Sequence, residues 1–149
     1  MKDEYIISLK GTQTVNNNDE TTEIVTSATY SEKDGVKYIK YKEYNPDTGK
    51  MYASTTLKIE SNEKLTVIKN NTSGICNQLP LEYNVRHHCL YSMPFGSLNV
   101  GIYTEAISCN IDENGGTIII DYSIDFNSDV QSDNHMEVIL RKKGEKENV

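Results

Sequence analysis

The stretch from residue 86 to residue 101 holds the densest group of chemically reactive side chains in the sequence. Its reactive members are Arg86, His87, His88, Cys89 and Tyr91. Imidazoles and thiolates bind metals, and a thiol beside an imidazole is a pair used in nucleophilic catalysis. The residue types therefore raise three possibilities: a metal site, a hydrolase that uses His87 with Cys89, and a haem site with His87 or His88 as axial ligand.

The spacing weakens each of these possibilities, because consecutive side chains of a strand point to opposite faces. His87, Cys89 and Tyr91 share one face, whereas Arg86 and His88 share the other. Adjacent histidines on a regular strand cannot hold one metal, and no third group or nucleophile motif supports His87 and Cys89. We therefore expect no catalytic residue, no metal and no cofactor, and we interpret the protein as a non-enzyme.

Three carboxylates could serve as acid and base groups. Asp121 and Asp125 share a strand face with Ser123, opposite an apolar face, so the simplest expectation is that they face solvent. Glu43 lies among tyrosines in a segment whose two faces are both mixed in polarity. A solvent-exposed Glu43 is the simpler expectation, and the alternative is a polar interior where it meets Lys69, Arg86 or a ligand.

These residues must be positioned by strands, because alternating apolar and polar residues recur along most of the chain. No helical stripe of apolar residues interrupts this pattern. The predicted strands cover residues 4–15, 23–33, 36–44, 51–60, 64–69, 75–83, 86–93, a strand from residue 97, 107–111, 118–126 and 135–141.

Turn residues separate the predicted strands. Asp34-Gly35 predicts a hairpin with a type I′ turn, and residues 45–49 and 114–116 predict further turns. Residues 16–19 predict a loop, and residues 93–96 predict the turn that ends the reactive stretch. Pro80 removes a ladder donor, so residues 75–83 should form an edge strand or contain a bulge.

The pattern predicts an all-β protein, and 149 residues suit a single domain. Both a sandwich and a barrel fit, but closing about eight to ten strands into a barrel removes the exposed edges. We predict a single antiparallel β-barrel over residues 1–141. Residues 142–149 carry mixed charge and little apolar surface, so we expect a disordered tail.

Composition excludes several partners. The net charge is −7, and no basic segment follows a phosphate backbone, so nucleic acid is not expected to bind. The acidic start of the sequence is unlike a signal peptide, and no apolar run is long enough for a membrane helix. We predict a cytoplasmic protein that does not bind membranes. Its three cysteines are expected to be reduced and to pack as small apolar residues.

Several short motifs, in their order and spacing, resemble the YwiB-like family of small bacterial proteins. They are residues 10–13 (Lys-Gly-Thr-Gln), Tyr41 with Glu43, residues 55–59, Arg86-His87, Tyr91, residues 94–98, residues 113–116 and Tyr122. The resemblance covers nearly the whole chain and implies a calycin-like (lipocalin-like) β-barrel. It implies no established activity, and for function only that calycin barrels commonly hold small apolar or amphipathic molecules.

We therefore expect non-catalytic binding of a small apolar or amphipathic molecule inside the barrel, in a pocket of about 300 Å³ or more. Tyr41, Glu43, His87 and Tyr91 are the candidate ligand-binding residues, because they are the polar groups most able to orient such a ligand. The alternative is a structural or protein-interaction barrel whose lumen is filled by side chains. A homodimer is possible in either case.

Overall fold

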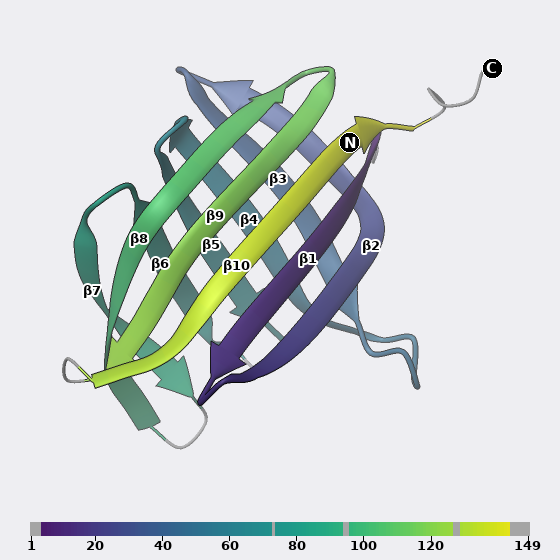
Figure 1. Cartoon of the computed structure of the whole chain (residues 1–149). Helices are drawn as coiled ribbons and strands as arrows, with labels where there is room; N and C mark the ends of the chain where they lie inside the picture. The colour runs from purple at the N-terminus through teal and green to yellow at the C-terminus, as the bar shows by residue number, and fades with distance from the viewer. Residues whose placement is uncertain (1–3, 73, 94–95, 127–128, 144–149) are drawn as a thin grey trace.

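The computed structural model describes residues 4–72, 74–93, 96–126 and 129–143. These residues form ten strands: β1 (Tyr5–Val15), β2 (Asn18–Lys33), β3 (Val36–Tyr44), β4 (Met51–Ser61), β5 (Lys64–Asn71), β6 (Cys76–Glu82), β7 (Arg86–Met93), β8 (Gly96–Asp112), β9 (Gly115–Phe126) and β10 (Asp129–Lys142). All ten belong to one antiparallel sheet in the order β6-β5-β4-β3-β2-β1-β10-β9-β8-β7 (Figure 1). The predicted all-β fold is confirmed. Within the described ranges, no helix is long and apolar enough to cross a membrane.

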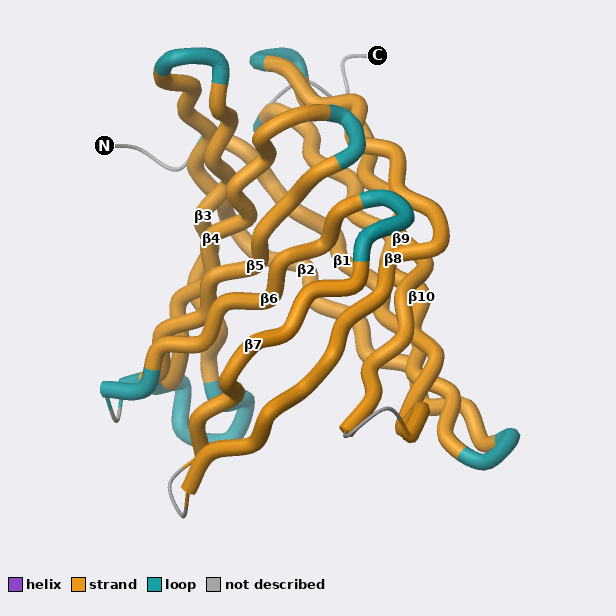
Figure 2. The backbone as a smooth tube through the Cα atoms, turned by 90° about the vertical axis from the view of Figure 1, so that its left-hand side faces the viewer, coloured by secondary structure: helices purple, strands orange, loops and turns teal. Residues whose placement is uncertain are grey.

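The sheet curls until its two edge strands, β6 and β7, lie side by side (Figure 2). A side chain bridges this seam: the Asn77 amide donates to the Ser92 carbonyl at 3.1 Å and accepts from the Ser92 N–H at 2.8 Å. Tyr83 and Thr104 add an isolated parallel bridge. The molecule is therefore a nearly closed barrel, and the predicted edge position of the strand that contains Pro80 is confirmed.

The two ends of the barrel differ. At the closed end, where the even-numbered strands finish, hydrogen bonds connect strands and turns that are not neighbours in the sheet. The Tyr5 hydroxyl donates to the Glu113 carbonyl at 2.6 Å, and the Cys109 N–H donates to the Asn62 carbonyl at 3.3 Å. We call the opposite end, where the odd-numbered strands finish, the mouth.

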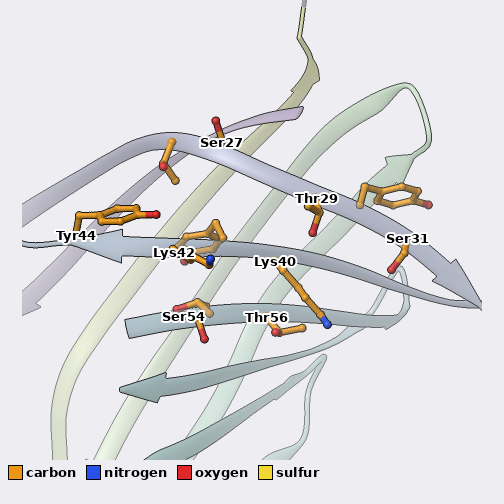
Figure 3. A pocket seen from close by; sticks show the side chains of 12 residues that line it. Ser27, Thr29, Ser31, Lys40, Lys42, Tyr44, Ser54 and Thr56 are labelled. Atoms are coloured by element: carbon orange, nitrogen blue, oxygen red, sulfur yellow. The ribbon is translucent and has the colours of Figure 1, made fainter. Parts of the chain in front are cut away.

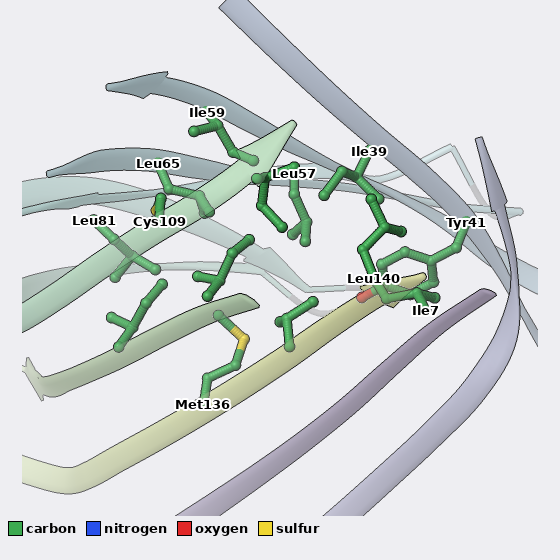
Figure 4. Packing of buried hydrophobic residues seen from close by; sticks show 14 of the residues in the cluster. Ile7, Ile39, Tyr41, Leu57, Ile59, Leu65, Leu81, Cys109, Met136 and Leu140 are labelled. Carbon is green, nitrogen blue, oxygen red and sulfur yellow. The ribbon is translucent and has the colours of Figure 1, made fainter. Parts of the chain in front are cut away.

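Apolar side chains fill the half of the lumen next to the closed end (Figure 4). Strand alternation explains this core, since every second residue of each strand points inward. Its fully buried aliphatic members are Ile7, Ile39, Leu57, Leu65, Leu81, Ile102, Ile118, Ile120 and Val138. The core also decides the orientation of β3, which the sequence left open. Ile39, Tyr41 and Glu43 point inward, and Lys40 and Lys42 point outward.

The hairpin turns follow the expected backbone chemistry. Asp34 and Gly35 have φ of 54° and 82°, as a type I′ turn requires, so this predicted hairpin is confirmed. The predicted loop at residues 16–19 is shorter than expected. Asn16 and Asn17 make a second tight turn with φ of 53° and 66°, and β2 already begins at Asn18. Asparagine tolerates this left-handed conformation better than most residues.

Several further strand boundaries differ from the predicted ones. The segments expected from residue 97 and at 107–111 form one strand, β8, whose register shifts between Thr104 and Ala106 at a bulge. β10 begins at Asp129, well before residue 135, and continues through Lys142. The predicted turn at residues 93–96 includes residues 94 and 95, which lie outside the described residues. Most of the predicted tail, residues 144–149, also lies outside them.

Candidate functional site

A row of inward-facing polar residues crosses four neighbouring strands near the mouth. Tyr41 on β3 is in register with Thr55 on β4, Thr55 with Lys69 on β5, and Lys69 with Asn77 on β6. Residues paired in register point to the same side of a sheet. Glu43 lies two residues beyond Tyr41 on the same face, so the ladder itself brings the carboxylate and the lysine together.

Glu43 is buried, with 8% of its surface exposed, which corrects the expectation of a solvent-facing carboxylate. Thr55 Oγ1 and the Tyr52 hydroxyl each donate a hydrogen bond of 2.9 Å, one to each carboxylate oxygen. Lys69 Nζ lies 3.4 Å from Glu43 Oε2. The charge is thus compensated by a cation and two hydroxyl donors, the condition under which a protein tolerates a buried carboxylate.

A β-bulge brings Tyr52 to this carboxylate. Glu43 pairs with Ala53 and Tyr44 pairs with Met51, so Tyr52 has no partner across the ladder. A bulge of this kind changes the direction of a side chain, and here the Tyr52 hydroxyl reaches Glu43. Burial, followed by the hydrogen bond to Glu43, raises the pKa of Tyr52. Burial is also the main reason why the pKa of Tyr41 is raised.

Beside these residues the mouth contains a mostly apolar cavity of about 380 Å³. Residues from β1, β6, β7, β8, β9 and β10 line it, and none of the described lining residues is charged. Its apolar and aromatic lining consists of Val15, Leu79, Tyr91, Leu98, Val100, Ile124 and Phe126. The volume falls within the range of small-molecule pockets. The lumen is therefore filled toward the closed end and hollow at the mouth.

A smaller and more polar cavity of about 270 Å³ adjoins the apolar one. Tyr91 lines both cavities, and Lys69 is the one charged residue among the described residues that line the smaller one. Tyr52 and Asn77 also line it. The mouth thus has an apolar wall on one side of Tyr91 and a polar wall, which contains Lys69, on the other.

The structure separates the four candidate residues into three places. Tyr91 lies at the mouth, and Glu43 lies behind Lys69 in the polar wall. Tyr41 is buried in the core cluster. His87 lies away from the mouth, with Nε2 2.9 Å from Glu82 Oε1 across the seam between β6 and β7.

The contacts of His87 and Cys89 do not form a catalytic pair. The imidazole contacts Glu82, and burial raises the pKa of the Cys89 thiol, which disfavours the reactive thiolate. Among the described residues, no group of three or more His, Cys, Asp or Glu side chains is placed to hold a metal ion. Cys109 is buried and Cys89 half-buried as expected, but Cys76 is exposed, because it begins the edge strand β6.

Asp125 also differs from the expectation, since it is buried on the outer face of the barrel. Arg86 Nε and Nη2 donate to its two carboxylate oxygens at 3.0 and 2.5 Å. Gly101 on β8 lies between the two residues and leaves room for their contact. A glycine inside a strand signals such a close approach, and Gly101 was the sequence feature that could have revealed this ion pair. Tyr52 and the apolar lining of the mouth were also missed.

The fold and the mouth together define an all-β protein with ten antiparallel strands in a nearly closed barrel that is hollow at one end. Residues 7–138 match the family model described as "Domain of unknown function (DUF1934)", and the chain belongs to this family. The ywiB protein from Bacillus subtilis has a crystal structure that aligns with a TM-score of 0.76, at 24% identity, over 95% of this chain and 94% of that one. The YwiB-like resemblance and the barrel are therefore confirmed. A search of curated proteins found no match.

Proposed function

We propose that the protein binds a small amphipathic molecule at the mouth of the barrel, in the cytoplasm and without catalysing a reaction. The observation that carries this proposal is the pair of adjoining cavities that share Tyr91. The apolar one, about 380 Å³, suits a hydrocarbon or aromatic portion, and the smaller one presents Lys69 and hydroxyl groups to a polar end. Apolar pockets with a few convergent polar groups are typical ligand sites.

The roles proposed for the candidate residues follow from their positions. Tyr91 lines both cavities, so in the proposed complex its ring contacts the apolar portion of the ligand and its hydroxyl binds the polar end. Glu43 acts indirectly by holding Lys69 and Tyr52. Tyr41 and His87 contribute to the barrel wall and not to the ligand contact.

A structural or protein-interaction barrel is the main alternative, and it predicts a lumen filled along its whole length. The core cluster fits that alternative only toward the closed end. The hollow mouth favours ligand binding. Its apolar side chains lack dispersion contacts on the side that faces the cavity, and a bound ligand would supply them.

Native mass spectrometry of the protein purified from its own cells is the first test, with a retained small molecule as the expected result. Isothermal titration with decanoate, decanol and decyltrimethylammonium then measures binding directly. Leu98 is 38% exposed in the structure, so a bound ligand would cover its remaining surface. Leu98→Arg removes this apolar contact and places a charge against the apolar portion of the ligand, which should raise the dissociation constant at least tenfold.

Leu90→Arg is the matched control. Leu90 is an exposed leucine on β7, and its register partner, Asn99, is the neighbour of Leu98 on β8. This control should bind like the wild type. The proposal is wrong if none of the three amphiphiles binds and no small molecule is retained, or if both arginine variants lose binding equally.

A further inference from the structure

A further cavity lies on the outer face of β2, β3 and β4 (Figure 3). Its volume is about 500 Å³. Lys40, Lys42 and Tyr44 in its lining are on the exposed face of β3, which places most of the cavity outside the barrel. The inward-facing residues Tyr41 and Thr55 also border it. We call this cavity the outer hollow.

The outer hollow exists because the wall of the barrel divides at this point. The ladder between β2 and β3 runs from Lys33 and Val36 to Ala28 and Tyr41. Beyond it, β3 continues beside β4 to Tyr44, while the preceding part of β2 continues beside β1. The two strands diverge and leave a recess between them.

The charge in the outer hollow has a single sign. Lys40 and Lys42 are the charged members of its lining, and no carboxylate belongs to the part of the lining that the structure describes. Among the described residues, neither ammonium has a carboxylate within 4.0 Å. In a chain of net charge −7, two unpaired lysines on one face of one strand are a local concentration of positive charge.

Hydroxyl groups flank both lysines. Thr29 on β2 and Thr56 on β4 are the register partners of Lys40, and Ser54 on β4 is the partner of Lys42. Figure 3 shows these side chains on the strands around the recess, with the Tyr44 ring at one end. Lysine donates hydrogen bonds only, whereas serine and threonine both donate and accept.

We propose that the outer hollow binds a phosphorylated small molecule. Lys40 and Lys42 lie two positions apart on one strand, so their Cα atoms are about 7 Å apart. Both ammonium groups can therefore contact one phosphate from opposite sides. Hydroxyls of Thr29, Thr56 and Ser54 donate to the remaining phosphate oxygens. Tyr44, half exposed at the end of the recess, covers the ring of the sugar or base that carries the phosphate. This site is separate from the mouth and does not depend on the function proposed there.

The test is a two-dimensional NMR titration of the full chain with inorganic pyrophosphate, glucose 6-phosphate, adenosine monophosphate and unphosphorylated glucose. The three phosphorylated probes should shift the backbone amides of Thr29, Ser54 and Thr56, and glucose should not. A tighter complex with adenosine monophosphate or with glucose 6-phosphate identifies the kind of ring that Tyr44 accepts.

Variants locate the site. A charge-assisted hydrogen bond contributes about 1.5 kcal/mol or more, so Lys40→Gln with Lys42→Gln should weaken phosphate binding at least tenfold. Lys58→Gln, on the same outer face of β4 but outside the lining, should have no effect. The inference is overturned if no phosphorylated probe binds at millimolar concentration, if glucose binds equally well, or if Lys58→Gln weakens binding as much as the double variant. Amphiphile titration at the mouth should be unchanged in all these variants.

Discussion

Replacing Gly101 by alanine tests the account of the Arg86–Asp125 pair on the outer face of the barrel. A Cβ atom at residue 101 would lie 2.5 Å from Arg86 Nη2 and 2.7 Å from both Asp125 carboxylate oxygens. A carbon atom cannot lie this close to a nitrogen or oxygen to which it is not bonded, so the side chains of Arg86 and Asp125 must shift and their bidentate contact is weakened. The carboxylate would remain in a buried position from which its guanidinium partner has been displaced.

The expected cost follows from the geometry. Two hydrogen bonds between charged groups contribute about 1.5–3 kcal/mol each when buried, but Arg86 is 36% exposed and can be rehydrated. We therefore assign about 2 kcal/mol to the pair. Alanine also reduces the conformational entropy of the unfolded chain, which stabilises the folded state by about 0.5 kcal/mol. Gly101→Ala should thus lower the free energy of unfolding by about 1.5 kcal/mol, measured by urea denaturation with circular dichroism.

Two comparisons make this prediction refutable. Gly11→Ala, where an added Cβ meets no atom within 4 Å, should be neutral or slightly stabilising. In a background that carries both Arg86→Ala and Asp125→Ala, Gly101→Ala should no longer lower the free energy of unfolding. The reasoning fails if Gly101→Ala is neutral in the wild type, or if it is equally costly in that background.

The remaining predictions concern one buried hydroxyl and one imidazole. Thr104 Oγ1 is fully buried and has no hydrogen-bond partner among the described residues. Because an unsatisfied buried hydroxyl is destabilising, Thr104→Val should raise the free energy of unfolding by about 1 kcal/mol. A loss of stability in urea denaturation would contradict this prediction. Hydrogen bonds to Asp121, and then to Glu137, raise the pKa of His135, so its NMR titration midpoint should lie above 6.5. The resulting stabilisation is complete below about pH 6.5 and is lost as pH rises through the folded-state pKa. His135→Gln should therefore lower the free energy of unfolding more at about pH 5.5 than at about pH 9. An equal decrease at both pH values would refute the assignment.

Local features of the fold were predictable because they depend on neighbouring residues alone. The Asp34-Gly35 turn follows from the need for positive φ at both central positions. Pro80 indicated an edge strand because it lacks a ladder donor. The inward face of β9 follows from the alternation of Ile120, Tyr122 and Ile124 with Asp121 and Ser123, although Ile119, which is exposed, departs from this pattern. In each case the physical cause lies within a few residues of the feature.

The positions of the reactive side chains depended on contacts between distant segments. Strand alternation correctly put His87, Cys89 and Tyr91 on one face, but only the closed sheet turned that face inward. Glu43 could not be assigned from its own strand, because both faces of that strand are mixed in polarity and the core that decides its orientation is formed with distant strands. Its cation partner, Lys69, likewise belongs to another strand, β5.

The sequence by itself determined that this chain forms antiparallel strands joined by tight turns, and its motifs indicated the family. Only the tertiary structure decided where the barrel is filled and where it is hollow. Alternation specifies which residues face the lumen, but whether their side chains meet at its centre depends on the curvature of the sheet and on which strands lie opposite one another. For the same reason the outer hollow, which depends on the divergence of β2 from β3, could not be predicted from any single segment.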